Sequence, residues 1–281
     1  MSRTSSVVGA LRTAHLLVEG EDGRARRAEG SAVELAVAAA RLGLRVLFLC
    51  GVTEDVDADV RSPLTAEGLD LAALHVPSGN PAAAVREGGE WEDPLRMAAR
   101  RDALVCTLDL PNAIVTAALR EAGRGDTLRA VCVPSAVSTD PRILADCDVL
   151  VCELAAAAAL VGGDEPGVTS RGFARRLGAY GPRKVVVIDR RGGASVYFDG
   201  ERLAPVDLGA PPEGGDRGAT YVTVFAAALV DALVHGDRSI HALGRAIAAA
   251  SLPPDPSDPD FPGLPAGEAL EGTLDPVEDG A

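Results

Sequence analysis

The stretch EGSAVELAVAAARLGLRVLFLCGVTEDV, residues 29–56, indicates the fold class of the chain. We expect SAVELAVAAARLG to be a helix, with Ser31 as its N-cap and Gly43 as the stop at its C-terminal end. The segment RVLFLCGV that follows is a continuous apolar run, which is typical of a strand covered on both faces. A helix followed directly by such a strand is typical of an α/β protein.

The same alternation of segments continues outward from this stretch. The segments expected to be strands are SSVVGAL, HLLVEG, DALVCTLDLP, LRAVCVPSA, DVLVCE and KVVVIDRR. The segments expected to be helices are NAIVTAALREAG, DPRILADC, LAAAAALVG, GFARRLGAYG, ATYVTVFAAALVDALVHG and SIHALGRAIAAASL. GGASVYFDGERLAPVDL is expected to form an antiparallel hairpin that turns at Asp199–Gly200. We therefore predict a central, mostly parallel sheet flanked by helices.

Composition excludes several classes of partner. The chain has 281 residues and a formal net charge of −14, so we expect it to bind neither nucleic acid nor an anionic membrane surface. No apolar run reaches the roughly 20 residues that span a bilayer, and we expect a cytoplasmic protein. The five cysteines form no CxxC pair, and we expect them to be buried thiols in a reducing compartment. They are Cys50, Cys106, Cys132, Cys147 and Cys152.

The order of the segments resembles the ribokinase family, the PfkB-type carbohydrate kinases. Residues 29–56 resemble the family's Gly-Gly loop, helix and Gly-x-x-x-Asp turn, and LTAEGLDLAAL resembles the segment after it. ADCDVLVCELAAAAALVGG resembles the segment with the Asn-x-x-Glu motif, and KVVVIDRRGGASVYFDG resembles the Thr-x-Gly-x-x-Gly strand and hairpin. PPEGGDRGATYVTVFAAALVDALVHG resembles the Gly-Ala-Gly-Asp turn and its helix. The resemblance covers nearly the whole chain.

This resemblance implies a domain plan. We expect a three-layer α/β/α ribokinase-like domain over residues 1–251, with a reduced β lid formed near residues 10–30 and 75–93. Residues 252–281 are rich in Pro, Asp and Gly, and we expect a mobile or surface-hugging tail there. Trp91, the one tryptophan, lies in the second lid segment, where it is either an interface anchor or a residue that packs on the core, and we favour packing.

The resemblance also implies an activity. The family transfers the γ-phosphoryl group of ATP to a hydroxymethyl group of a sugar or nucleoside, with Mg²⁺. An Asp at a helix N-terminus takes the hydroxyl proton, and backbone N–H groups of the glycine turn hold the phosphoryl group. Phosphoryl transfer depends mainly on positioning and electrostatic stabilisation, which a helix N-terminus supplies to an anion.

On the substrate side, this sequence departs from the family's residues. The first strand usually supplies an Asn and an Asp to the sugar, and those positions hold Arg12 and Ala14. The Gly-Gly loop becomes Glu29-Gly30, and the substrate-binding Asn corresponds to Glu34. A carboxylate still accepts hydrogen bonds from hydroxyl groups, so Glu34 is the main sugar-binding candidate, alongside Arg12 and Gly30. The alternative is that Glu34 is a solvated helix residue.

On the nucleotide side, the motifs have also changed. The Asn-x-x-Glu motif becomes CELA, residues 152–155, with Glu153 close by. The Thr-x-Gly-x-x-Gly motif becomes IDRRGG, residues 188–193. Glu153, Arg190 and Gly193 are therefore the candidates for nucleotide or phosphate binding, and Arg190 is equally compatible with a solvated turn. No residue is assigned as a metal ligand, because Cys and Ala are poor ligands for Mg²⁺.

Two registers compete for the catalytic base. Counting from the motif selects Asp216, with Gly215 before it to approach the phosphate. Counting back along the apolar helix selects Thr223, whose hydroxyl cannot replace a carboxylate base near neutral pH. We prefer the second register, because burial constrains helices more than loops.

Three functional hypotheses follow. The first is a ribokinase-fold protein that has lost sugar phosphorylation and acts as a small-molecule-binding or regulatory pseudokinase. The second is an active kinase that uses ATP and Mg²⁺, with Asp216 as base and a sugar, nucleoside or related small molecule as substrate. The third is a protein-interaction module that works as a homodimer or larger oligomer.

Overall fold

The computed structural model describes residues 3–10, 12–17, 24–52, 58–76, 81–86, 88–163, 169–191, 194–199, 202–208, 218 and 220–273. The strands are β1 Thr4–Ala10, β2 Arg12–Leu17, β3 Arg24–Glu29, β4 Arg45–Val52, β5 Asp70–His75, β6 Ala103–Thr107, β7 Leu128–Val133, β8 Val149–Glu153, β9 Lys184–Ile188, β10 Ala194–Phe198 and β11 Leu203–Asp207. The helices are α1 Ser31–Arg41, α2 Ala58–Ala66, α3 Pro81–Ala84, α4 Glu92–Ala98, α5 Asn112–Ala122, α6 Leu154–Leu160, α7 Ser170–Gly178, α8 Thr220–Val234, α9 Ser239–Ala250 and α10 Gly267–Glu271, with a 3₁₀ turn at Pro141–Asp146.

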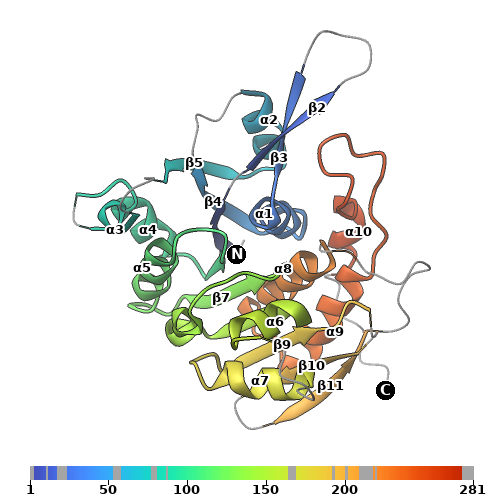
Figure 1. Ribbon diagram of the computed structural model, residues 1–281. Coiled ribbons are helices and arrows are strands. Elements are labelled where there is room, and N and C mark those ends of the chain that lie inside the picture. The colour runs from blue at the N-terminus through green and yellow to red at the C-terminus, as the bar shows by residue number, and fades with distance from the viewer. Residues whose placement is uncertain are drawn as a thin grey trace.

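The described strands form one large sheet and one small one. The large sheet has nine strands in the order β11-β10-β9-β8-β7-β6-β1-β4-β5, and β2 pairs with β3 apart from it (Figure 1). Neighbouring strands from β9 to β5 are parallel, whereas β10 is antiparallel to both β9 and β11. The predicted mostly parallel α/β sheet and the predicted antiparallel pairing of residues on either side of Asp199 are therefore confirmed.

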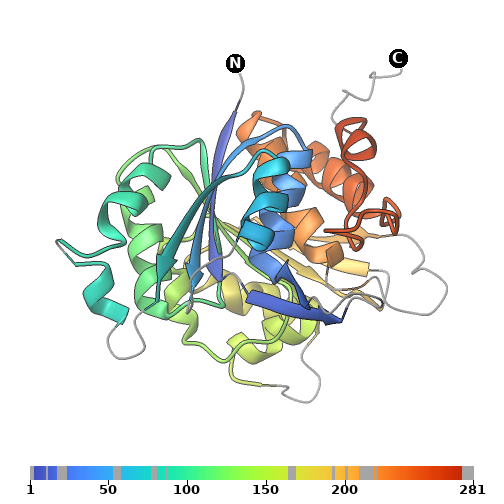
Figure 2. The same cartoon turned by 90° about the horizontal axis from the view of Figure 1, so that it is seen from above.

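Helices cover both faces of the sheet, so the molecule has three layers (Figure 2). Successive strand residues alternate between the two faces: Val7 packs in the core with α1, α8 and α9, whereas Val8 packs in the core with α4, α5, α6 and α7. Because both faces are covered, strands such as β4 and β6 are buried along most of their length, as their continuous apolar sequences predict.

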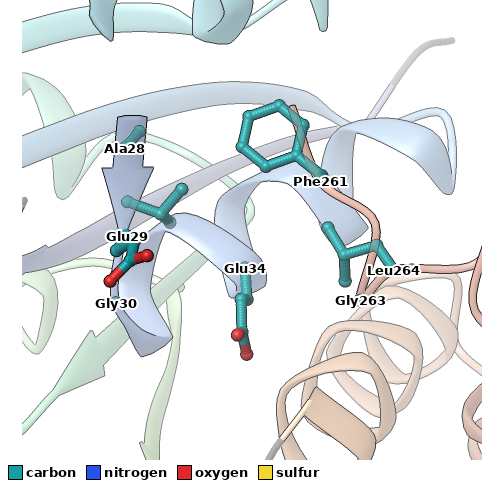
Figure 3. Close-up of a pocket in the computed structure, with 8 residues that line it drawn as sticks. Ala28, Glu29, Gly30, Glu34, Phe261, Gly263 and Leu264 are labelled. Atoms are coloured by element: carbon teal, nitrogen blue, oxygen red, sulfur yellow. The ribbon is translucent and has the colours of Figure 1, made fainter. Parts of the chain in front are cut away.

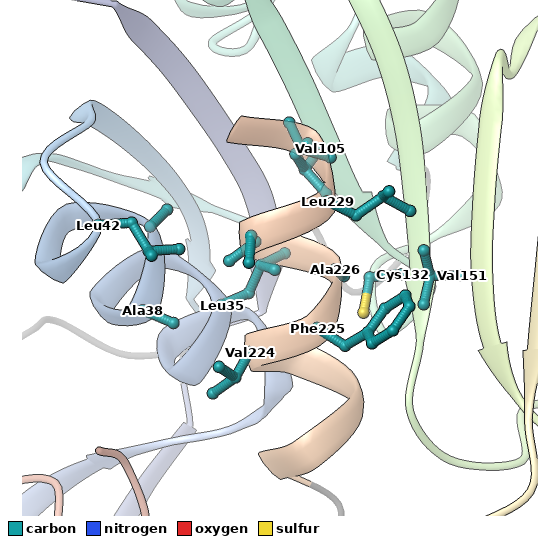
Figure 4. Packing of buried hydrophobic residues seen from close by; sticks show 14 of the residues in the cluster. Leu35, Ala38, Leu42, Val105, Cys132, Val151, Val224, Phe225, Ala226 and Leu229 are labelled. Atoms are coloured by element: carbon teal, nitrogen blue, oxygen red, sulfur yellow. The ribbon is translucent and has the colours of Figure 1, made fainter. Parts of the chain in front are cut away.

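Helix α8 is the central element of one helical layer. Every residue from Tyr221 to Ala232 is buried, which confirms the prediction from its almost wholly apolar sequence. Its side chains Val224 and Phe225 lie among Leu35 of α1 and Cys132 of β7 (Figure 4). No helix in the described part of the chain is both long and apolar enough to cross a membrane.

The ends of α1 are set by two glycines. Gly43 has a φ of 81°, which confirms it as the C-terminal stop. The predicted N-cap at Ser31 is wrong: Ser31 is the first helical residue, and Gly30 is the N-cap. Gly30 has a φ of 120°, a conformation that is open to glycine and strained for other residues.

The two segments expected to form the lid differ in structure. The first is the β2–β3 hairpin. The described residues of the second, 75–93, contain α3 and the first two residues of α4. Trp91 is fully buried there, and its indole N–H donates to the carbonyl of His75 at 3.1 Å, so its predicted packing on the core is confirmed.

The Pro-rich C-terminal segment lies against α1. Of residues 252–281, the structure describes 252–273, and this stretch is called the strap below. Phe261, Leu264 and Leu270 of the strap are buried in the same core cluster as α1 and α8. The strap therefore forms part of the surface next to the N-terminus of α1.

Candidate functional site

The carboxyl ends of the parallel strands meet at one edge of the sheet, where ligands bind in open α/β folds. Gly9, near the end of β1, lets α1 approach this edge closely. A Cβ atom on Gly9 would lie 2.2 Å from Cβ of Ala32 and 2.3 Å from Oγ1 of Thr107. The close packing at Gly9 therefore fixes the start of α1 beside the ends of β1 and β6.

A pocket of about 260 Å³ lies at the start of α1. Figure 3 shows Glu29 and Gly30 on one side of it, Phe261, Gly263 and Leu264 of the strap on the other, and the Glu34 carboxylate between them. Ala28 and Val33 complete the lining. The pocket thus combines an apolar wall with two carboxylates, which accept hydrogen bonds from hydroxyl groups.

Glu34 and Thr223 meet beside this pocket. The Thr223 hydroxyl oxygen lies 3.2 Å from Glu34 Oε2 and 2.8 Å from the carbonyl oxygen of Thr220. Thr223 has 0% of its surface exposed and lies inside α8, which begins at Thr220. Its hydroxyl has one proton to donate, and both acceptors are already in place.

Asp109 is a further candidate that the sequence reasoning missed. It is half-buried two residues after β6, and it accepts a hydrogen bond from the Thr107 hydroxyl. Burial raises the pKa of the nearby Cys132 thiol, and the carboxylates of Glu34 and Asp109 raise it further. The signal in the sequence was an acidic residue directly after a buried parallel strand, at the ligand-binding edge of the sheet.

The candidates on the nucleotide side form a second group at the ends of β8 and β9. The Glu153 carboxylate caps α6 by accepting a hydrogen bond from the backbone N–H of Ala155 at 2.9 Å. Its other oxygen lies 4.0 Å from Nε of Arg190. The structure therefore brings Glu153 and Arg190 together, as a helix cap beside a guanidinium group.

Of the remaining predicted site residues, the structure gives the strand position of Arg12 and does not describe the other three. Arg12 lies in β2, opposite Glu29 of β3 in the hairpin register. Gly193, Gly215 and Asp216 lie outside the described residues, so the register around Asp216 stays a prediction. Among the described residues, no group of three or more His, Cys, Asp or Glu side chains is placed to hold a metal ion.

The five cysteines are all buried, as expected. Burial raises the pKa of the Cys50 thiol to about 12, and it also raises the pKa of the other four thiols. A thiol reacts as its thiolate, so none of these groups is a nucleophile near neutral pH.

Comparison with known proteins identifies the architecture. No protein-family model matches the sequence, and no curated protein matches it. Among solved structures, a carbohydrate kinase from Agrobacterium tumefaciens is 19% identical, with a TM-score of 0.71 and 97% of each chain covered. Arabidopsis thaliana ribokinase, complexed with ribose and ATP, is also 19% identical, with a TM-score of 0.71, covering 98% of this chain and 99% of that one.

A pyrophosphate-dependent kinase in the ribokinase family, complexed with a pyrophosphate analogue and myo-inositol, is 16% identical. Its TM-score is 0.67, and the match covers 96% of this chain and 100% of that one. These three matches each cover 96–98% of this chain. The chain therefore has the ribokinase-like fold of these carbohydrate kinases.

Proposed function

We propose that this chain is a ribokinase-fold protein that binds a small hydroxylated molecule in the pocket at the start of α1 and does not phosphorylate it. The observation that carries the proposal is Thr223, which is fully buried within α8 with its hydroxyl beside Glu34 and the Thr220 carbonyl. In the helix register, this is the position of the catalytic base. A threonine hydroxyl has no useful basicity there.

The pair also argues against a carboxylate at the same position. An Asp at position 223 would lie next to the Glu34 carboxylate in a buried setting, where two like charges disfavour each other. A neutral hydroxyl that donates to Glu34 is compatible with the same packing. The Glu34–Thr223 pair therefore fits a role in ligand binding. It does not fit the arrangement of a catalytic carboxylate base next to a substrate-binding residue.

The residues that the structure describes on the nucleotide side do not fit a Mg²⁺–phosphate group. Glu153 caps α6 and lies beside Arg190, and its neighbours Cys152 and Ala155 supply no hard oxygen ligand through their side chains. These residues are therefore consistent with a protein that does not transfer phosphate from Mg²⁺·ATP.

The pocket favours a neutral, hydroxyl-rich ligand. Glu29 and Glu34 accept hydrogen bonds from hydroxyl groups, and their charge disfavours a phosphate or another anion. Ribose and myo-inositol, with which two of the similar structures are complexed, are suitable probes of this class.

Calorimetric titration and thermal unfolding test the proposal. We expect ribose or myo-inositol to bind and to stabilise the fold, by about 2.7 kcal/mol at ~100 times the Kd. We expect no binding of Mg²⁺·ATP or Mg²⁺·pyrophosphate, and no phosphorylated product. Glu34→Gln should weaken polyol binding roughly tenfold, whereas the exposed control Asp59→Asn should leave it unchanged.

The active-kinase hypothesis makes the opposite forecast. Phosphorylated product that disappears in Asp216→Asn, with the fold intact, would establish Asp216 as the base and overturn the proposal. Binding of neither polyol nor nucleotide would also overturn it, because the pocket would then have no ligand of the proposed class.

A further inference from the structure

The strap closes one side of the pocket, and Arg41 of α1 adds polar contacts to its buried apolar anchors. Arg41 Nη1 donates to the carbonyl of Pro265 at 2.9 Å, and Nη2 donates to Asp258 at 2.5 Å. The same guanidinium group forms a two-pronged pair with Glu67, just after α2, with Nε 3.0 Å from the carboxylate. Its carbon atom lies 5.8 Å from the centre of the Phe261 ring.

This junction is largely shielded from water. Only 8% of the Arg41 side chain is exposed, against 21% for Glu67 and 14% for Asp258. Hydrogen bonds from Arg to carboxylates are among the stronger ones, particularly when they are paired and partly buried. Burial alone would lower the pKa of Arg41, but the hydrogen bonds to Glu67 and Asp258 raise it, so the group stays charged.

The pocket wall is folded as one unit behind Arg41. The Asp258 carboxylate accepts hydrogen bonds from the backbone N–H groups of Asp260 and Phe261, both at 2.9 Å. The N–H of Leu264 donates to the carbonyl of Phe261 at 3.0 Å, and the carbonyl of Leu264 accepts from Asp255 at 2.8 Å. The hydrogen bonds from Arg41 to Asp258 and Pro265 therefore fix both ends of the stretch that contains Phe261, Gly263 and Leu264.

We propose that Arg41 is a positioning residue for the ligand pocket, and that its junction with Glu67, Asp258 and Pro265 sets how often the strap opens to expose the pocket. Arg41 does not line the pocket; it acts through Phe261 and Leu264, which do. This inference rests on the proposed function only for the identity of the ligand, because the opening of the wall is a property of the protein alone.

The chain provides a sensitive test of this opening. Val33 lines the pocket and is 1% exposed, so Val33→Cys introduces a thiol of similar size behind the strap. The native cysteines are buried and are poor nucleophiles, so Cys106, in the core on the other face of the sheet, reports global unfolding in the same sample. Mass spectrometry after timed maleimide labelling separates the two thiols.

We expect Arg41→Met to accelerate labelling at position 33 roughly tenfold or more beyond any acceleration at Cys106. Arg41→Lys should restore part of the protection, because a lysine keeps the charge and reaches one carboxylate. The control Arg129→Met removes another paired arginine, whose partner is Asp148, and should leave position 33 protected.

Equal labelling at position 33 in the Arg41→Met and unsubstituted backgrounds would overturn the inference. Parallel acceleration at position 33 and Cys106 would also overturn it, since Arg41 would then act only on global stability. Amide exchange of the strap gives an independent readout if Val33→Cys folds poorly. None of these readouts uses a ligand. The inference about Arg41 can therefore be overturned while polyol binding is observed, or supported while no polyol binding is observed.

Discussion

The hydroxyl of Thr223 lies 3.2 Å from the carboxylate of Glu34, although 189 positions separate the two residues in the chain. The contact joins the start of α1 to the first turns of α8, beside the ligand pocket. Because the two side chains are in direct contact, substitutions at both positions should have coupled effects on stability.

Thr223→Asp should destabilise the fold by about 3 kcal/mol, because it buries a second carboxylate beside Glu34 without a compensating charge. Adding Glu34→Asn should recover at least ~1 kcal/mol of that loss. Chemical denaturation of the two single variants and the double variant measures the coupling. Thr65→Asp, on the exposed side of α2, should change stability by no more than about 0.5 kcal/mol. Strict additivity of the two substitutions would contradict the contact.

Gly9→Ala should destabilise the fold by about 2–3 kcal/mol, because its Cβ would meet Ala32 and Thr107 at less than contact distance. Gly244→Ala is the matched control. Gly244 is exposed in α9, and a Cβ added there would point into open space, so its replacement should stabilise the helix by roughly 0.5–1 kcal/mol. Thermal unfolding should therefore move in opposite directions for two substitutions that are chemically the same.

Arg245→Met should destabilise the protein by about 3–5 kcal/mol. Arg245 pairs at 2.8 Å with Asp231, which is 0% exposed, so the substitution leaves a buried carboxylate whose remaining ion-pair partner among the described residues is His235. Arg124→Met provides the comparison, since Arg124 is 73% exposed in its pair with Glu121, and such pairs contribute about 0–1 kcal/mol. Similar losses for both variants, measured by urea denaturation, would rule out a special role for burial.

Acid should loosen the strap before it unfolds the core. Burial favours a higher pKa for Asp258, but hydrogen bonds from Phe261, Arg41 and Asp260 outweigh it and lower the pKa below the ordinary value. A lowered folded-state pKa means that this stabilisation is complete above the unfolded value, about 3.9, and is lost as the pH falls through the folded value. Amide exchange of the strap, corrected for intrinsic rates, should therefore rise below about pH 4 relative to that of α8. Asp258→Asn should abolish the difference.

The sequence was informative about the elements and less informative about their partners. The buried strands, the hairpin at Asp199 and the apolar helix α8 could be predicted because their signals lie in neighbouring residues. The junction of Arg41 with Asp258 spans 217 positions, and no local pattern encodes such a contact. The helical structure of part of residues 75–93 was missed because the expectation came from the family's lid and not from the residues themselves.

The site shows the same division. Glu34 was selected by its correspondence to a family position, yet its contact with Thr223 depends on how α1 and α8 pack. Asp109 was overlooked because a single acidic residue after a strand is a common pattern until the strand order places it at the shared edge. Spacing along the chain identifies candidate site residues. The packing of the helical layers on the sheet determines which of these residues are in contact.

The position of β11 at the end of the large sheet has a consequence for association between chains. An outermost strand exposes backbone groups that invite pairing with another molecule. Pro205 lies in the middle of β11, opposite Val196, and it has no backbone N–H to donate. A strand from another molecule that paired with β11 would lack one backbone N–H donor at Pro205. This residue therefore disfavours edge-to-edge aggregation at β11.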